Sequence, residues 1–215
     1  MITHSIFKQK GITLIELLIT LVISGMVIAG TYRIFVAQSK AYTVQDQVVE
    51  VQQNIRSAME ILLRDLRMTG FDSDDINSKI TIANPIIIGA DSVTVNYEYD
   101  NTTQYTVAYG FDAPSQTLRR QLTTIKDDGS TTAGSQDVLL DNVEAFNFTY
   151  GIDTNDDGGV ERWVDAGAVG LAKVIAVQVR LTARPPKQEN EDVQKMVYPR
   201  TLESAVTLRN LCLNR

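Results

Sequence analysis

Residues 12–32, ITLIELLITLVISGMVIAGTY, form a largely apolar run in which Glu16 is the only charged side chain. At the rise of an α-helix this run would be about 32 Å long, close to the ~30 Å hydrocarbon core of a bilayer. The run is therefore predicted to be a helix that can cross a membrane, with one carboxylate near its start.

The residues before the run have the charge of a secretory signal but not its order. Lys8 and Lys10 supply a basic start, yet the small residue Gly11 precedes the apolar run. In a secretory signal the small-residue cleavage site follows the apolar stretch. A cut at Gly11 would therefore leave the helix on the mature protein. Because positive charge stays cytoplasmic, the bulk of the chain is predicted to lie on the other side of the membrane.

Two interpretations of Glu16 remain open. A carboxylate deep in a bilayer costs about 2.5–3.5 kcal/mol on insertion scales, so such a residue usually has a partner. Glu16 lies one turn from Ile12 and could instead reach the lipid headgroups. Alternatively, a cut after Gly11 would create an α-amine on Ile12, which the Glu16 of a neighbouring subunit would neutralise as the helices bundle.

The stretch KGITLIELLITLVISGMV, residues 10–27, resembles the class III leader of type IV pilins and of type II secretion pseudopilins. The resemblance implies that a prepilin peptidase cuts between Gly11 and Ile12 and N-methylates Ile12, and that Glu16 serves in assembly. Ile12 stands where phenylalanine is commonest in these families. The apolar helix lacks the proline that many major pilins carry, which argues against a major pilin.

Beyond the membrane segment, apolar residues recur at spacings of three and four at Val44, Val48, Val51, Ile55, Met59, Leu62 and Leu66. This spacing predicts an amphipathic helix with one apolar face. Gly70 and the polar stretch FDSDD (71–75) predict the end of this helix. A helix from Ile12 to about Thr69 would be about 87 Å long. Its first half would lie in the membrane or fibre core, and its second half would pack on a domain.

The rest of the chain is predicted to form strands. Apolar and polar residues alternate in DSVTVNYEYD (91–100), TQYTVAYG (103–110), VEAFNFTYG (143–151) and KVIAVQVRLTA (173–183), and LESAVTLRN (202–210) can add another strand. A hairpin turn is predicted at residues 100–102. The tracts KDDGSTTAGSQD (126–137) and RPPKQENED (184–192) are predicted loops, because their Gly, Pro and polar content resists packing.

The predicted fold class is α+β: a long N-terminal α-helix, its first half transmembrane, packed on a C-terminal antiparallel β-sheet. The resemblance identifies this arrangement as the type IV pilin fold. The predicted parts are a leader peptide (1–11), a transmembrane or fibre-core helix (12–35), an amphipathic helix half (36–70) and a β-rich periplasmic globular domain (71–215).

Composition argues against nucleic-acid binding and against catalysis. The chain has 20 Lys and Arg against 26 Asp and Glu, whereas a phosphate-backbone partner calls for basic patches. The single cysteine, Cys212, excludes an intrachain disulfide and a Cys-rich zinc site, and is expected to pack as a small apolar residue. His4 is the only histidine and would leave with the leader, so no histidine-based triad can exist in the mature chain. An enzyme is not expected.

One loop is a candidate calcium site. The sequence DTNDDGG places Asp153, Asn155 and Asp157 at alternate positions before a glycine, as in the first half of a calcium loop. The bidentate glutamate expected at the twelfth position is missing, because Val164 stands there; Glu161 or Asp165 could substitute. The favoured alternative is a polar turn between a strand ending at 150 and one beginning near 163. No other cofactor is expected.

Two further stretches resemble one family among the type IV pilins. IRSAMEILLRDLRMTGF (55–71) is similar to the helix end of the PilW family of minor pilins, and TLESAVTLRN (201–210) to its final strand. This implies a minor pilin of the inner membrane, single-pass with a periplasmic C-terminal domain, that helps to initiate pilus assembly and enters the pilus. Its implied partners are other minor pilins, the major pilin, prepilin peptidase, the inner-membrane assembly platform and membrane lipid.

Two alternatives stay open. The large J-type minor pseudopilin of type II secretion shares the leader and a similar Arg-Asp-Leu-Arg helix end. A membrane-tethered periplasmic binding module would keep the anchor and the sheet but would assign no meaning to Gly11 or Glu16.

Overall fold

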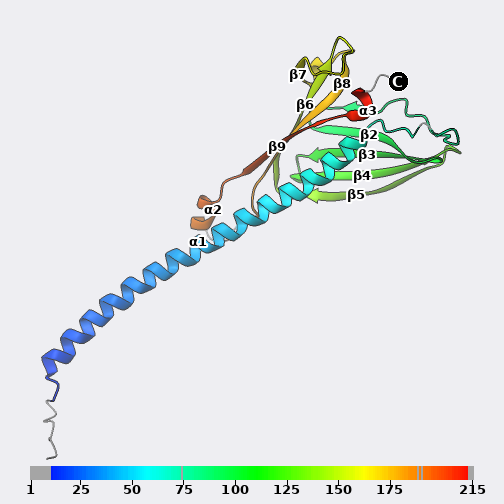
Figure 1. Ribbon diagram of the computed structural model, residues 1–215. Helices are drawn as coiled ribbons and strands as arrows, with labels where there is room; N and C mark the ends of the chain where they lie inside the picture. Colours follow the sequence, from blue (N-terminus) through cyan, green and yellow to red (C-terminus); the bar gives the residue numbers. More distant parts are fainter. Residues whose placement is uncertain (1–10, 74, 188, 190, 213–215) are drawn as a thin grey trace, which may run out of the picture. The chain divides into compact units, whose positions relative to one another are not determined.

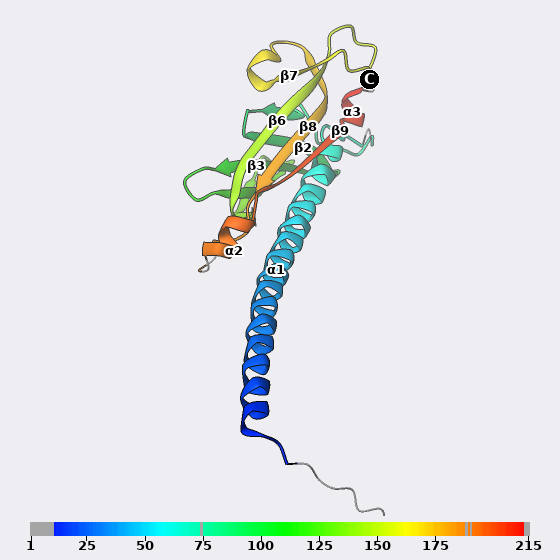
Figure 2. The same cartoon turned by 90° about the vertical axis from the view of Figure 1, so that its left-hand side faces the viewer.

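One long helix, α1 (Leu14–Met68), runs through both units into which the chain divides, Met1–Gln45 and Asp46–Arg215 (Figures 1 and 2). The computed structural model describes residues 11–73, 75–187, 189 and 191–212. The predicted helix is confirmed, whereas most of the predicted leader, with Lys8, Lys10 and His4, falls outside the described residues.

Gly70 ends α1 as predicted. Its φ is +68°, in the left-handed region that glycine adopts without a Cβ penalty. A Cβ at this position would lie 2.6 Å from Cδ2 of Leu211 and 3.1 Å from Cβ of Pro85. The chain therefore needs glycine here both for the turn and for the close approach of two other segments.

Within Asp46–Arg215, α1 buries the predicted apolar face. Val51, Ile55, Met59, Leu62 and Leu66 are all buried, and Ala58 and Leu63 join them. The opposite face, with Arg56, Glu60 and Arg64, is exposed. Burying a side chain of this size contributes roughly 1.5–3 kcal/mol. This half of α1 is therefore part of the hydrophobic core of its unit.

The first sheet is an antiparallel meander of five strands in the order β1-β2-β3-β4-β5. The strands are β1 (Ile86–Ile88), β2 (Ser92–Asp100), β3 (Thr103–Asp112), β4 (Thr117–Lys126) and β5 (Thr131–Leu140). The predicted turn between β2 and β3 is present: the carboxylate of Asp100 accepts hydrogen bonds from the backbone N–H and the hydroxyl of Thr102, both at 2.9 Å.

A second antiparallel sheet has the order β7-β6-β8-β9. Its strands are β6 (Val143–Asp153), β7 (Arg162–Asp165), β8 (Lys173–Ala183) and β9 (Arg200–Thr207), and the short helices are η1 (Ala166–Ala168), α2 (Glu191–Met196) and α3 (Arg209–Cys212). One sheet was predicted and two are present. The chain turns at Asn142, whose φ is +54°, and β6 then pairs with β8 instead of β5.

The prediction of a loop at 126–137 is wrong. Lys126 is the last residue of β4, and Thr131–Leu140 forms β5. Every side chain from 131 to 138 is exposed, so the tract buries almost nothing, and its backbone pairs with β4 nonetheless. The expectation that polar residues resist packing was correct, but a strand at the edge of a sheet needs only main-chain partners. In the other predicted loop, Arg184–Lys187 is irregular, and its last two residues belong to α2.

A buried charged cluster joins α1 to the first sheet. Asp65, 2% exposed, accepts a hydrogen bond from the hydroxyl of Tyr109 at 2.6 Å and two from Arg120, at 3.0 and 2.9 Å. Burial and the neighbouring carboxylate raise the pKa of Tyr109 well above its ordinary value, so the phenol stays protonated and donates. The cluster satisfies a carboxylate that would be costly to bury alone.

Candidate functional site

The start of α1 places Glu16 beside Thr13. The backbone N–H of Glu16 donates to the hydroxyl of Thr13 at 3.3 Å, and Oε2 of Glu16 lies 3.5 Å from both the N and the Oγ1 of Thr13. Thr13 precedes the first helical residue, so the sequence T-L-I-E has the spacing of a capping box. The contacts to Oε2 are at the long limit of a hydrogen bond, which leaves the carboxylate able to accept a stronger donor.

The T-x-x-E spacing was visible in the sequence, but its capping role was not predicted. The capping contacts give Glu16 a partner within its own chain, in addition to the two interpretations above. None of the described contacts distinguishes a neighbour's amine from the lipid headgroups, so the assembly role of Glu16 stays a prediction.

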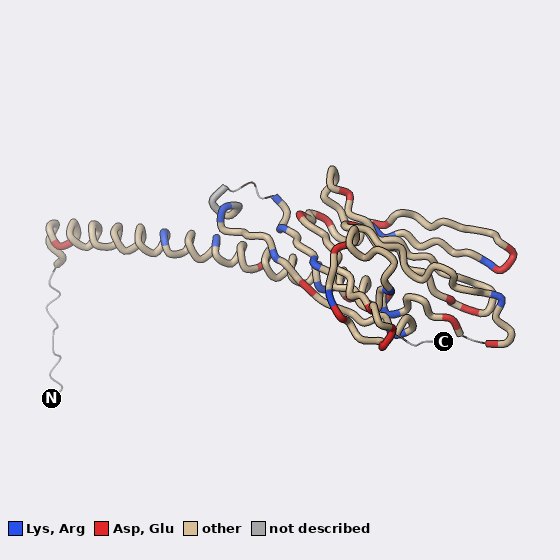
Figure 3. The backbone as a smooth tube through the Cα atoms, turned by 90° about the horizontal axis from the view of Figure 1, so that it is seen from above, with Lys and Arg blue, Asp and Glu red and all other residues tan. Residues whose placement is uncertain are grey.

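The residues after Gly11 form an uncovered apolar surface. Every residue from 11 to 35 is exposed, including Leu14, which is 82% exposed, and Met26, which is 71% exposed. By length and composition α1 can cross a membrane: its most apolar window has a mean hydropathy of 2.2 and none of it is buried. Few charged residues interrupt this part of the helix (Figure 3). This apolar helix is therefore a candidate membrane anchor.

Gly11 and Ile12 lie just before α1. A Cβ on Gly11 would meet no atom within 4 Å, and the same is true of Gly25 and Gly30 in the helix. The fold therefore does not require glycine at position 11.

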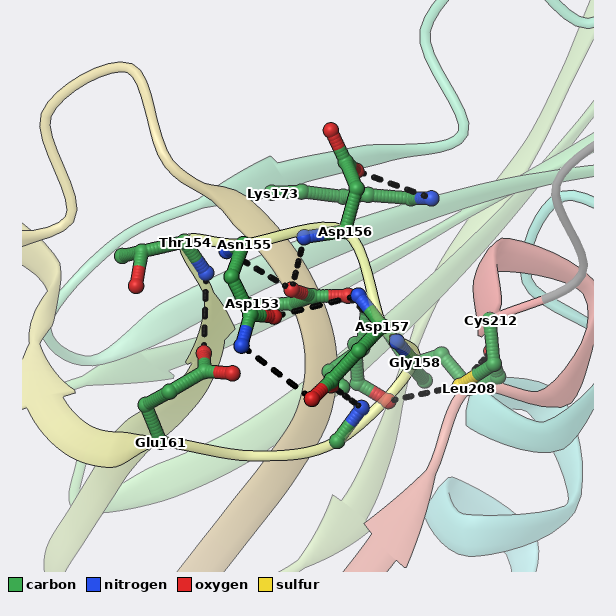
Figure 4. Close-up of polar contacts among 12 residues, drawn as sticks. Asp153, Thr154, Asn155, Asp156, Asp157, Gly158, Glu161, Lys173, Leu208 and Cys212 are labelled. Carbon is green, nitrogen blue, oxygen red and sulfur yellow. Dashed lines mark hydrogen bonds and ion pairs between the residues drawn. The ribbon is translucent and has the colours of Figure 1, made fainter.

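The candidate calcium loop connects β6 to β7, between Asp153 and Arg162 (Figure 4). Carboxylate oxygens of Asp153, Asp157 and Glu161 lie within 4.8 Å of one another. Of the two substitutes that the sequence suggested for the missing glutamate, Glu161 thus joins the aspartates, whereas Asp165 belongs to β7, opposite Thr149. Asn155 uses its amide oxygen to accept the backbone N–H of Asp157, at 3.1 Å.

The same carboxylates organise the loop from within. Asp153 accepts backbone N–H bonds from Asn155, Asp156 and Gly158, at 3.2, 2.7 and 2.9 Å. Burial acts to raise the pKa of Asp153, but these three bonds outweigh it and hold the pKa below the ordinary value. Asp153 is thus a carboxylate at neutral pH. These bonds fit the polar-turn interpretation and leave calcium binding as a prediction.

The loop lies against the C-terminal helix. A Cβ on Gly158 would be 3.5 Å from the carbonyl oxygen of Cys212, and the thiol of Cys212 lies 3.4 Å from the carbonyl oxygen of Leu208 (Figure 4). Burial raises the pKa of this thiol. Cys212 is half-buried, as expected of a small residue that packs near the end of the chain.

Comparison with known proteins places these features in a family. Residues 6–32 match the prokaryotic N-terminal methylation motif, and residues 104–210 match the type IV pilus-assembly protein W, PilW. A solved type IV-like pilin from Thermus thermophilus is similar at 14% sequence identity, with a TM-score of 0.47, over 74% of this chain and 97% of that chain. No curated protein matches the sequence significantly.

The methylation motif lies over the exposed apolar start of α1, and the PilW match covers β3 to α3 almost completely. A long helix on antiparallel sheets carries both. The chain is therefore a type IV pilin-like protein with a prepilin-type leader motif and PilW-like features.

Proposed function

We propose that this chain is a minor pilin that is cut by prepilin peptidase between Gly11 and Ile12 and helps to start a type IV pilus at the inner membrane. The observation that carries the proposal is the exposed apolar segment at residues 12–35, which starts directly after the proposed cleavage position and overlaps the matched methylation motif over residues 12–32. The lysines of the leader would stay cytoplasmic and the unit Asp46–Arg215 would be periplasmic.

The physical difficulty in starting a pilus lies in the apolar helix. To leave the bilayer, a subunit must replace lipid contacts with helix contacts of comparable quality. The first subunits have few neighbours to cover their helices. A small set of minor pilins with complementary domains could form this first complex and receive the major pilin.

Glu16 would set the register of that complex. After the cut, Ile12 carries a new amine, and a Glu16 carboxylate on a neighbour would neutralise it inside an apolar bundle. The long contacts of Oε2 to Thr13 support this role, because a charged amine is a stronger donor than a threonine at 3.5 Å. The role is structural and needs no catalytic group. Its other partners would be the major pilin and the assembly platform.

The first test is the chemistry of the mature N-terminus. Mass spectrometry of the chain purified from its own membranes should find N-methyl-Ile12 as the first residue. Gly11→Leu should block the cut, because a branched side chain is unsuited to a site that accepts glycine. Gly25→Ala is the matched control, since that glycine also has open space around it. A mature chain that still begins with Met1 would exclude the proposal.

The second test is the effect of deleting the gene. Surface pili should be lost or sharply reduced, while the major pilin is still processed and stored in the membrane. If pili form in normal number and an exported enzyme stays in the periplasm, the chain is a J-type pseudopilin instead.

A further inference from the structure

β9 is an edge strand of the second sheet, so only one of its two sides is paired. It has 8 residues, whereas β7, at the other edge of the same sheet, has 4. Proteins commonly keep edge strands short, because an edge presents unpaired N–H and C=O groups to any strand that approaches it. The long edge of β9 is therefore a place at which a further strand can add.

The register with β8 decides which main-chain groups face this free edge. Just beyond the end of β9, the backbone N–H of Leu208 donates to the carbonyl oxygen of Ile175 at 2.7 Å. In an antiparallel pair, hydrogen-bonded positions alternate with positions that are not hydrogen-bonded. The N–H and C=O groups of Ala205 and Thr207 therefore point away from β8. Within the described part of the chain, no other main-chain or side-chain group bonds to them.

These two residues lie on one wall of a groove, here named the β9 groove. It has a volume of about 580 Å³ and lies between the last residues of β9 and the end of α1, with α3 beside it (Figures 1 and 2). Met68, Phe71 and Val206 supply its apolar lining. Phe71 is 37% exposed, so part of its ring is open to a partner.

The charge of the β9 groove is positive. Arg67 and Arg209 both line it and are exposed, and neither has an ion-pair partner among the described residues. No acidic side chain lines the groove. Glu203, the carboxylate of β9, lies outside it and accepts a hydrogen bond from the amide of Gln178. Two cations that share a groove repel each other, so an anionic group that enters the groove is attracted by both.

We propose that the β9 groove binds an extended, acidic segment of a different protein as an added strand. The free N–H and C=O groups of Ala205 and Thr207 pair with the main chain of that segment, which is the general mode of recognition by strand addition. Its carboxylates meet Arg67 and Arg209, and its apolar side chains cover Phe71. The main-chain pairing selects an extended peptide, and the two arginines select its charge.

Neither the ends of this chain nor a second copy fits the groove as well. The segments 1–10 and 213–215, which lie outside the described residues, contain Lys8, Lys10 and Arg215 but no aspartate or glutamate. A contact between different surfaces of identical chains would repeat from copy to copy, whereas a minor subunit is proposed to enter one starting complex. The choice of a different protein therefore rests on the proposed function.

Synthetic peptides test the groove on the purified full-length chain in detergent. The probe is a fluorescent six-residue peptide in which aspartate alternates with valine, and fluorescence polarisation measures its binding. It should bind, and added salt should weaken the binding, because salt screens exposed charges. The same peptide with lysine in place of aspartate should not bind. If the aspartate peptide does not bind, the proposal is wrong.

Methylation of the peptide backbone tests the added strand. Successive residues of a strand direct their N–H groups to opposite edges, so methylating only the aspartate N–H groups or only the valine N–H groups blocks one edge at a time. One of these two peptides should lose at least ten-fold in affinity, and the other should bind like the unmodified probe. Equal affinities of the two would show that no strand is added.

Charge reversal tests the place of binding. Arg67→Glu with Arg209→Glu should lower the affinity for the aspartate peptide at least ten-fold and should let the lysine peptide bind. The matched control, Arg56→Glu with Arg162→Glu, changes two exposed arginines outside the groove and should keep the wild-type affinity. Unchanged affinity after the first pair of substitutions overturns the proposal.

Two further outcomes separate the second copy and the proposed function from this inference. Differently tagged copies of the full-length chain should not associate through the groove. If they co-purify and Arg67→Glu with Arg209→Glu abolishes this, the occupant is a second copy and the proposal is wrong. If the peptide binds but the mature chain does not begin at Ile12, only the proposed function is wrong. If the chain is processed and needed for pili but no peptide binds, only the β9 groove is wrong.

Discussion

The two halves of α1 differ in what covers their apolar residues. In Asp46–Met68 the apolar side chains form one face, which packs into the core of the same unit. In Leu14–Gln45 the apolar side chains surround the helix, and most of them are exposed. A helix that is apolar all round is stable only when something else covers it. One half of α1 therefore finds its partners inside the chain, and the other half needs lipid or neighbouring subunits.

The largest expected effect comes from Glu16→Ala, which changes the first half alone. The variant should be cut at Gly11 and stay in the membrane, but it should be absent from sheared pili, because a neighbour's amine loses its carboxylate. Its thermal unfolding in detergent should match that of the wild type, since among the described residues the hydrogen bonds of Glu16's side chain go to Thr13 at the long distance of 3.5 Å. Immunoblots of sheared fibres measure the result.

Glu60→Ala is the control for this variant, because Glu60 is an exposed glutamate in the second half of the same helix. It should enter pili normally. If Glu16→Ala enters pili normally, the pairing of Glu16 with a neighbour's Ile12 amine is not needed for assembly, and this part of the proposal is wrong.

The next effect compares the same substitution in both halves. Leu62 is 0% exposed, whereas Leu21 is 68% exposed. Leu62→Ala should lower the free energy of unfolding by about 2–5 kcal/mol, because it removes transfer energy and leaves a cavity. Leu21→Ala should leave it nearly unchanged. Denaturant unfolding of the full-length chain in detergent measures both, and equal losses would show that the halves do not differ as described.

A smaller, pH-dependent effect concerns the loop after α1. Glu98, 1% exposed, accepts the backbone N–H and hydroxyl of Ser73 and the hydroxyl of Ser78, the latter at 2.7 Å. Burial acts to raise the pKa of Glu98, but these bonds outweigh it and hold the pKa below its ordinary value of 4.5. Since the folded pKa is the lower one, this stabilisation is present above about pH 4.5 and is lost as the pH falls through the folded pKa.

Glu98→Gln should therefore be less stable than the wild type at pH 7 and should lose less stability on acidification. Unfolding midpoints between pH 7 and pH 3 measure the difference. Glu60→Gln should follow the wild-type curve. If Glu98→Gln follows it too, the Ser73 and Ser78 contacts contribute nothing to the pH dependence.

The smallest effect is expected at the loop between β6 and β7. If calcium binds through Asp153, Asn155 and Asp157 with help from Glu161, a concentration ten times the dissociation constant adds about 1.4 kcal/mol to the free energy of unfolding. Asp157→Asn should abolish the shift, and Asp128→Asn should keep it. Calorimetry without heat and no thermal shift at millimolar calcium would leave the loop as a polar turn.

The sequence alone was enough to predict most elements, because their signals are local. The spacing of Val51, Ile55 and Leu62 marks one helix face, and Gly70 marks its end. Alternation identified β2, β3, β6 and β8 to within a few residues, because strands with one buried face repeat every two residues. The leader motif was also local, so Gly11, Ile12 and Glu16 were found without a structure, although their roles stay predictions.

Only the tertiary structure decided the features that depend on distant partners. β5 has no alternation, since all its side chains from Thr131 to Val138 are exposed, and only its pairing with β4 makes this stretch a strand. The division into two sheets follows from the turn at Asn142 and from the choice of β8 as the partner of β6. The Asp65–Arg120 pair joins residues whose spacing carries no signal, and only the fold selects Glu161 over Asp165 as the neighbour of Asp153. Local periodicity predicts which face of a helix or strand is buried. It does not predict which other element packs on that face, because that contact forms between residues far apart in the sequence.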